Sequence, residues 1–284
     1  MPGGPSRPAA VSGALRLEAP AKLNLSLRIV GRRDDGFHLL ESEIVLLELA
    51  DRLLLMPGSS GLRVEGSADG VPPDGTNLAW RGLRAGMGGE PELACLTLEK
   101  RVPSAAGLGG GSSDAAAGWR LGRAWRGIDA GVTREDLATL AEIGADVPFF
   151  AAGVAAARVG GIGETVEAMP AVGRYVVLVH PPFGLSTAAV FAELRPDEWG
   201  ALENDLLAPA RRLAPALNDL MAAVADAGGT PRLTGSGPTI FSLEDDAERA
   251  SAVAAALAAR GVRATITSTR TGPTEVERVD EEEL

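Results

Sequence analysis

Alternating apolar and polar residues near the start of the chain predict its first strand. Leu23, Leu25, Leu27 and Ile29 are separated by other, mostly polar, side chains over residues 22–29. This period of two is typical of a β-strand with one buried face. Short apolar runs predict further strands at residues 44–49, 53–56, 93–98, 175–179, 232–233, 239–243 and 262–269.

Helical spacing and capping residues predict helices between these strands. Thr133 is a typical N-cap before the apolar spacing of residues 134–143, and Thr76 or Asn77 is a candidate cap for a helix at residues 76–84. The other helices are expected at residues 112–125, 187–194, 213–227 and 247–260. Strands and helices mixed in this way indicate an α+β protein.

A stretch rich in glycine and alanine, residues 153–163, divides the pattern into two halves. In the second half strands and helices alternate, which favours a small α+β sandwich. We therefore expect a disordered leader at residues 1–13, a first domain at 14–153, a second domain at 154–275 and an acidic tail at 276–284.

Composition narrows the class of partner. A net charge of −11 and a pI of about 4.8 disfavour a nucleic-acid binder, which normally presents a basic face. No run approaches the roughly 18 apolar residues that span a bilayer, and the start lacks the apolar core of a signal peptide. Cys95 is the single cysteine and there are two histidines, so neither a disulfide nor a zinc site is expected. We predict a cytoplasmic protein that acts on a small molecule, without nucleic-acid or membrane partners.

Residues 107–113 read Gly-Leu-Gly-Gly-Gly-Ser-Ser and lead into a predicted helix. An ordered glycine costs about 0.5–1 kcal/mol relative to alanine, so a fixed run of glycines requires a reason. Glycines let a ligand approach the backbone, and a helix N-terminus adds free N–H groups and partial positive charge. This combination suits a polyphosphate.

Other interpretations of the loop fit less well. A flexible linker does not usually run from a strand into a capped helix. A Walker A loop requires a lysine after the glycines, and none is present. A dinucleotide fingerprint, as in a dehydrogenase, requires a third glycine where Ser112 stands. A phosphate loop of the kinase type is therefore favoured.

Further residues have both a functional and an ordinary interpretation. Lys22 could neutralise phosphate charge, or could belong to the solvated face of a strand. Asp146 could position an acceptor hydroxyl, or could cap a turn. The glycines of residues 234–238 could hold a ligand or form an ordinary turn. Pattern alone leaves these alternatives open, and Phe37 and Phe191 could equally be core residues.

Three segments together resemble the motifs of the GHMP kinases. They are residues 19–25, 103–116 and 233–238. Shorter segments narrow the resemblance to the branch of this family that phosphorylates a methylerythritol linked to cytidine diphosphate. They are residues 36–40, 76–78, 144–148 and 204–205. The resemblance covers nearly the whole chain. It implies a two-domain α+β fold, with an N-terminal ribosomal-protein-S5-domain-2-like ATP-binding domain and a C-terminal ferredoxin-like α/β sandwich.

The resemblance implies an enzyme that uses ATP and Mg²⁺ to phosphorylate the 2-hydroxyl of its substrate, in the non-mevalonate pathway to isoprenoid precursors. It implies that Asp146 accepts or orients the hydroxyl proton, while Lys22 stabilises charge in the transition state. The implied ATP contacts are Pro103, Ser104, Ala105, Ala106, Gly107, Leu108, Gly109, Gly110, Gly111, Ser112, Ser113, Asn77 and Leu78. The implied substrate contacts are Asn24, Phe37, His38, Thr187, Phe191, Gly235, Ser236 and Gly237.

By the same resemblance, Phe37 and Phe191 sandwich the cytosine and His38 reads its polar edge. A tyrosine is usual where Phe37 stands, so a hydroxyl is lost while the stacking face is kept. No magnesium ligand is assigned, although the hydroxyl of Ser112 or Ser113 is a candidate. Two alternatives stay open: a GHMP kinase that acts on homoserine or a mevalonate-type substrate, and a non-catalytic nucleotide sensor on the same fold.

Overall fold

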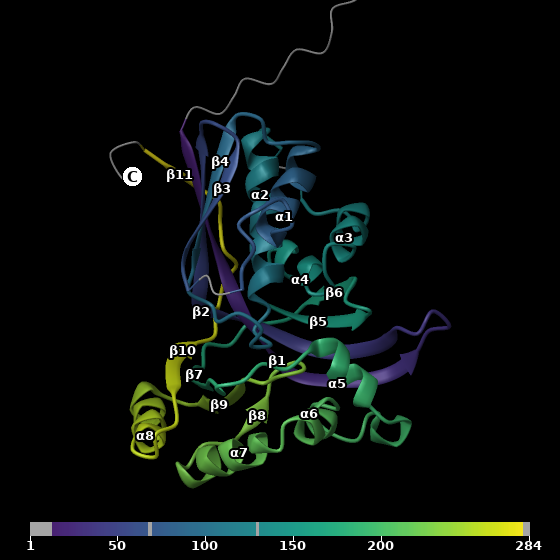
Figure 1. The fold of residues 1–284 in the computed structure, drawn as a ribbon, viewed down its shortest axis with the longest axis vertical. Helices are drawn as coiled ribbons and strands as arrows, with labels where there is room; N and C mark the ends of the chain where they lie inside the picture. The colour runs from purple at the N-terminus through teal and green to yellow at the C-terminus, as the bar shows by residue number, and fades with distance from the viewer. Residues whose placement is uncertain (1–12, 68–69, 129–130, 281–284) are drawn as a thin grey trace, which may run out of the picture.

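The computed structural model describes residues 13–67, 70–128 and 131–280, which form two β-sheets with helices on one face of each (Figure 1). The expected leader lies outside the described residues except for Gly13. No helix within the described ranges is long and apolar enough to cross a membrane.

The first sheet has seven strands among the described residues, in the order β11-β1-β2-β4-β3, with β5 paired to β2 and to β6. Its strands are β1 (Ala14–Arg32), β2 (His38–Pro57), β3 (Gly61–Gly66), β4 (Ala94–Lys100), β5 (Ala156–Gly161), β6 (Thr165–Ala168) and β11 (Glu277–Val279). Strands β1 and β2 form a long antiparallel hairpin that reaches down to the second sheet (Figure 1).

The prediction of separate strands at residues 44–49 and 53–56 was wrong, because both belong to β2. Asp51 interrupts the apolar run, yet it pairs with Ala19 of β1 and its side chain is fully buried. A buried carboxylate and a solvated turn carboxylate look the same in a sequence. The run was therefore divided at a residue that lies inside the strand.

Four helices cover one face of the first sheet (Figure 1). They are α1 (Leu78–Met87), α2 (Gly110–Trp125), α3 (Arg134–Ala141) and α4 (Val147–Ala151). The side chains of Asn77 and Thr133 cap α1 and α3, which confirms both expected caps. Helix α2 begins two residues before the predicted start at Ser112, because Gly109 adopts a left-handed conformation at its N-cap.

The second sheet is antiparallel, in the order β10-β7-β9-β8. Its strands are β7 (Tyr175–Val179), β8 (Arg232–Leu233), β9 (Ile240–Glu244) and β10 (Ala264–Ser268). Below it lie α6 (Leu207–Leu213), α7 (Ala216–Asp226) and α8 (Ala247–Ala258), while α5 (Thr187–Glu193) lies beside it (Figure 1). The short η1 (Pro196–Glu198) follows α5 in the chain. The expected single helix at residues 213–227 begins instead with α7, because Ala214 leaves the helical conformation before Pro215. The α+β fold of the prediction is confirmed.

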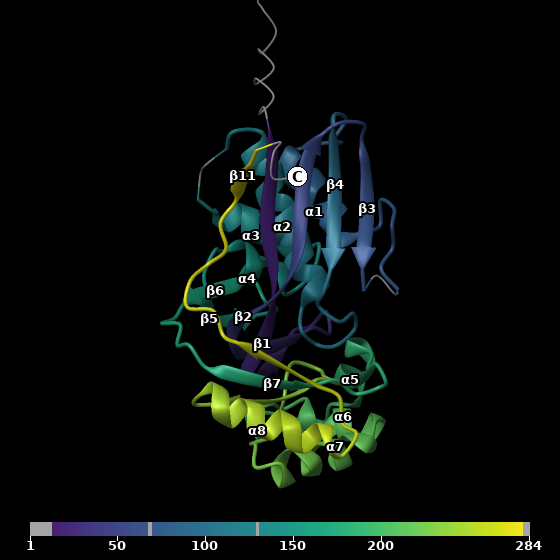
Figure 2. The ribbon, with the colours of Figure 1, turned by 90° about the vertical axis from the view of Figure 1, so that its left-hand side faces the viewer.

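The first sheet does not end near residue 153, where we expected the first domain to end. Strands β5 and β6 follow that point and still belong to the first sheet. Figure 2 shows the C-terminal segment returning from the second sheet to the first, where β11 pairs with β1 inside the expected acidic tail. The stretch rich in glycine and alanine includes β5, in which small residues such as Ala157 are buried against the helices.

Candidate active site

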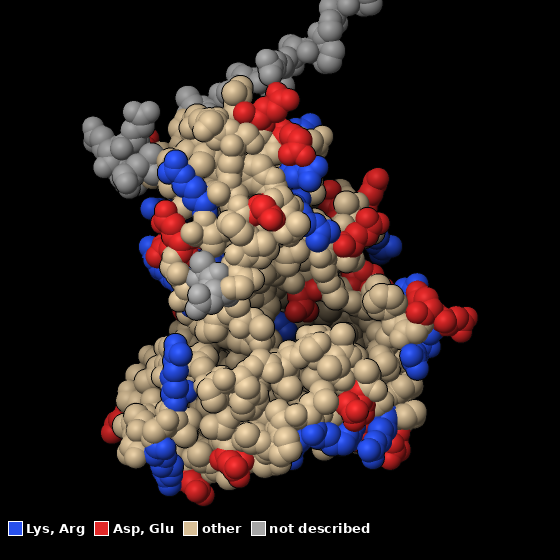
Figure 3. Space-filling view, viewed as in Figure 1, with Lys and Arg blue, Asp and Glu red and all other residues tan. Residues whose placement is uncertain are grey.

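A cavity of about 970 Å³ lies where the two sheets meet. Figure 3 shows this hollow between the upper and lower parts of the molecule. Of the predicted site residues, all line the cavity except Ser113 and Gly237. Ser113 is buried and lines a small crevice beside Arg120 instead, because consecutive residues of a helix point in different directions.

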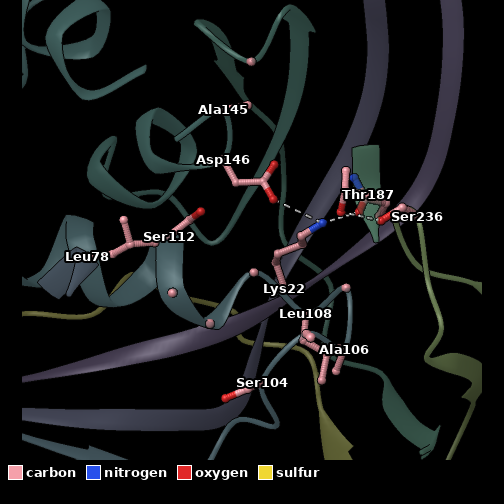
Figure 4. Close-up of a pocket in the computed structure, with 18 of the residues that line it drawn as sticks. Lys22, Leu78, Ser104, Ala106, Leu108, Ser112, Ala145, Asp146, Thr187 and Ser236 are labelled. Atoms are coloured by element: carbon pink, nitrogen blue, oxygen red, sulfur yellow. Dashed lines mark hydrogen bonds and ion pairs between the residues drawn. The ribbon is translucent and has the colours of Figure 1, made fainter. Parts of the chain in front are cut away.

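Lys22 and Asp146 meet in this cavity. Lys22 Nζ lies 3.4 Å from Asp146 Oδ2 and also donates to Asn24 Oδ1 (Figure 4). The Lys22 side chain is 5% exposed, whereas that of Asp146 is 36% exposed. Lys22 therefore does not lie on a solvated strand face. It is a buried cation in the wall of the cavity, and its ammonium group contacts the carboxylate of Asp146.

Asp146 stands just before α4, at the N-cap position, but its side chain makes no capping hydrogen bond. Asp146 thus lies in a turn, as the ordinary interpretation allowed, but its side chain does not cap the helix. Its carboxylate faces the cavity, with Lys22 as its ion-pair partner (Figure 4).

The phosphate loop is tied to β1 and to the second glycine loop. The Lys22 backbone N–H donates to the Leu108 carbonyl at 2.9 Å. Gly107 has φ +76, and a Cβ at this position would lie 2.7 Å from the Gly237 carbonyl oxygen. Gly235 has φ +56, and a Cβ there would lie 3.3 Å from Lys22 Nζ. Gly107 is thus required by a close approach of the backbone and Gly235 by its left-handed conformation, and the two loops meet beside the buried lysine.

Asn204 holds the second glycine loop, a role that the sequence did not reveal. Its Nδ2 donates to the carbonyls of Leu233 at 2.8 Å and Gly235 at 2.9 Å. From the other side, the Asn24 backbone N–H donates to Thr234 Oγ1 at 3.0 Å. The loop at residues 234–238 is therefore anchored from two elements and is more than an ordinary turn.

The aromatic end of the cavity is formed by the tip of the β1–β2 hairpin and by α5. The rings of His38 and Phe191 are stacked with centroids 5.5 Å apart, whereas Phe37 is 61% exposed. Thr187 Oγ1 lies 2.9 Å from Ser236 Oγ, which joins α5 to the second glycine loop. Burial, with a further contribution from Arg32, lowers the pKa of His38, so its imidazole is neutral at pH 7.

A buried charge cluster beneath the phosphate loop was missed by sequence reasoning. Lys100 Nζ donates to Asp51 Oδ2 and, at 2.8 Å, to Asp114 Oδ2. Asp51 Oδ1 also accepts the backbone N–H of Val102 at 2.8 Å, at the start of the loop. Lys100 therefore joins the strand before the loop to the helix after it. Burial raises the pKa of Asp114 to about 8. The attraction of Lys100 lowers this pKa, whereas the repulsion of Asp51 raises it further.

We expect the stability of the Asp114→Asn variant to fall less steeply with rising pH than that of the parent protein. The pKa of Asp114 rises from an ordinary 3.8 to about 8 in the folded protein. Between these values the folded state binds more protons than the unfolded chain, so stability falls as pH rises, by at most about 1.4 kcal/mol per pH unit. Chemical denaturation of both proteins at about pH 6 and about pH 8 measures this. A stability difference between variant and parent that does not change with pH would contradict it.

Comparison with known proteins agrees with this arrangement. The model of the GHMP kinases N terminal domain matches residues 77–154, and that of the GHMP kinases C terminal matches residues 188–263. The 4-diphosphocytidyl-2-C-methyl-D-erythritol kinase of Paracoccus denitrificans (strain Pd 1222) is 40% identical over an alignment of 266 residues, and the match covers 86% of this chain and 92% of that protein. The chain belongs to the GHMP kinase family.

Solved structures place this GHMP kinase within its family. A crystal structure of 4-(cytidine 5'-diphospho)-2C-methyl-D-erythritol kinase matches with a TM-score of 0.76 and 32% identity, covering 90% of this chain and 100% of that one. The mevalonate kinase of L. major, in complex with R-mevalonate, matches with a TM-score of 0.66 and 16% identity, covering 94% and 98%. The second match reflects the shared fold alone.

Proposed function

We propose that this GHMP kinase transfers the γ-phosphate of ATP to the 2-hydroxyl of 4-diphosphocytidyl-2-C-methyl-D-erythritol, yielding the 2-phosphate and ADP in the non-mevalonate pathway to isoprenoid precursors. One observation carries the proposal: the Lys22–Asp146 pair lies in the same cavity as a glycine-rich phosphate loop and a stacked His38–Phe191 pair. The phosphate loop suits a nucleoside triphosphate, and the aromatic pair suits a base.

The geometry supports a division of roles between the catalytic pair. Asp146 is the more exposed partner, so its carboxylate orients the acceptor hydroxyl and takes its proton. Lys22 keeps Asp146 ionised through their 3.4 Å contact and offers its ammonium to the charge that develops on the transferred phosphoryl group. The N-terminus of α2 and the loop before it hold the triphosphate.

Mg²⁺ would neutralise phosphate charge during the transfer. Ser112 is the hydroxyl that fits it, because it lines the cavity together with Asp146 while Ser113 does not. Within the described residues, no three His, Cys, Asp or Glu side chains form a metal cluster. The ion would therefore be held mainly by the phosphates and by water, as is usual for magnesium bound with a nucleotide.

The nucleoside end of the acceptor would lie against His38, Phe191 and Phe37. The neutral imidazole of His38 offers one donor and one acceptor to the polar edge of cytosine. A homoserine or mevalonate-type acceptor has no base for these rings. The presence of both Lys22 and Asp146, in contact with each other, argues against a non-catalytic nucleotide sensor.

The proposal is tested by measuring ADP release with ATP, Mg²⁺ and a panel of acceptors: the cytidyl substrate, its methylerythritol phosphate fragment, homoserine and mevalonate. We expect turnover with the cytidyl substrate alone. Turnover with homoserine or mevalonate and none with the cytidyl substrate would overturn the substrate assignment. ADP release that does not depend on any acceptor would overturn the assignment as an alcohol kinase.

A further inference from the structure

We propose that Trp199 is a positioning residue for recognition of the base, because it holds the imidazole of His38 in the orientation that faces the cavity. This inference rests on the proposed function, in which His38 reads the cytosine edge. Trp199 lies in the segment between η1 and α6, and no motif in the sequence singled it out.

Two rings enclose the imidazole of His38. Phe191 is stacked on it at 5.5 Å with an interplanar angle of 30°. Trp199 lies 5.7 Å away at 87°, which is the edge-to-face geometry that aromatic rings favour. The two contacts restrain the plane of the imidazole from different directions.

His38 depends on these rings for its orientation. Within the described part of the chain, its imidazole makes ring contacts but no hydrogen bond to another side chain or to the backbone. It is the first residue of β2, directly after the turn that carries the exposed Phe37. A ring at the tip of a hairpin, without a polar partner, would otherwise rotate freely about its side-chain torsions.

The segment that carries Trp199 is anchored on both sides. Before Trp199, Arg212 Nη2 donates to Glu198 Oε2 at 3.0 Å. After it, Asp205 accepts the backbone N–H groups of Gly200 at 2.7 Å and Leu202 at 3.1 Å. Asp205 Oδ2 also accepts the N–H of Ile29 in β1 at 2.7 Å. The segment is thus tied to the same hairpin that carries His38.

Packing, and not a polar contact, holds the indole in place. Trp199 packs against the core cluster beneath the second sheet, and its Nε1 is buried without a hydrogen-bond partner among the described residues. The ring surface of Trp199, rather than its N–H, is therefore what contacts His38. Phenylalanine would keep a ring at this place, whereas leucine would fill the volume without an aromatic surface.

Steady-state kinetics of Trp199→Leu and Trp199→Phe test the proposal. For Trp199→Leu we expect KM for the cytidyl substrate to rise roughly 2- to 12-fold, the size of one aromatic contact, with kcat and KM for ATP nearly unchanged. For Trp199→Phe, KM for the cytidyl substrate should stay close to the parent value. Leu202→Ala, in the same segment, is the control, because Leu202 is 42% exposed and has no aromatic ring. Equal KM values for the parent and Trp199→Leu would overturn the proposal.

A double-mutant cycle tests whether Trp199 acts through His38. In a His38→Ala background, Trp199→Leu should raise KM for the cytidyl substrate no further. The same fold increase in both backgrounds would contradict the proposed route. A lower kcat together with a higher KM for both substrates and a lower melting temperature would assign Trp199 to general stability. That result would overturn a positioning role.

Histidine NMR provides a readout that needs no substrate. The chain has two histidines, so the two imidazole Cε1–H resonances can be assigned by a single substitution. Trp199→Leu should shift the His38 resonance and leave that of His180, which is hydrogen-bonded to Thr265, in place. An unmoved His38 resonance would overturn the proposal. If the parent enzyme fails to use the cytidyl substrate while the His38 resonance still shifts, the proposed substrate fails and the ring contact stands.

Discussion

Asp146→Asn is expected to lower kcat about 100- to 10,000-fold while ATP binding stays nearly unchanged. Asparagine keeps the shape of the side chain but cannot accept a proton from the acceptor hydroxyl. The fold should tolerate the change, because Asp146 makes no capping hydrogen bond and is 36% exposed. The measurement is single-turnover phosphorylation of the cytidyl substrate, with ATP affinity determined separately by calorimetry.

The matched control is Asp219→Asn, since Asp219 is an exposed aspartate on α7 that does not line the cavity. It should leave kcat unchanged. A kcat for Asp146→Asn within a few-fold of the parent would remove Asp146 from the catalytic role. A large loss of ATP affinity would instead assign Asp146 to nucleotide or magnesium binding.

Lys22→Met is expected to lower kcat by about 100- to 1000-fold, the cost of removing one fixed group that stabilises transition-state charge. Methionine fills most of the lysine channel, in which the lysine stem packs against Gly109, and removes only the ammonium. The backbone hydrogen bond from Lys22 to Leu108 is kept, so the phosphate loop should keep its place. The measurement is kcat and KM for both substrates, beside the melting temperature.

Arg28→Met is the control for Lys22→Met. Arg28 lies on the same strand, but it is exposed and does not line the cavity. It should not change kcat. If Lys22→Met raised KM for ATP and left kcat intact, Lys22 would bind the ground state only, and the proposed contribution to the transition state would be wrong.

Much of the local structure could be predicted because it depends on neighbours in the sequence. The period of two in β1, the caps Asn77 and Thr133, and the glycine-rich start of α2 are all set within a few residues. A break was predicted at Asp51, where the strand continues, and the break at Ala214 was not predicted. The strand continues because Asp51 is buried within the sheet. The helix is interrupted because Ala214, directly before Pro215, leaves the helical conformation.

The candidate site was predicted unevenly. Lys22 and Asp146 were named through the resemblance to GHMP kinases. Pattern alone left a solvated face equally possible for Lys22 and favoured a turn or cap for Asp146. The cluster around Lys100 and the ring of Trp199 were missed altogether. Their partners are far away in the chain: 49 residues separate Lys100 from Asp51. Charged and aromatic residues at such distances have no periodicity that would connect them.

The sequence by itself predicted a phosphate loop at residues 107–113, because a run of glycines that leads into a helix suits a polyphosphate and lacks the lysine of a Walker A loop. Only the tertiary structure decided what surrounds that loop. It buried Lys22 against Asp146, placed Ser112 in the cavity and Ser113 outside it, and set Trp199 beside His38. The physical reason is that burial and contact are properties of the packed chain, whereas a sequence records only which side chains are available to be packed.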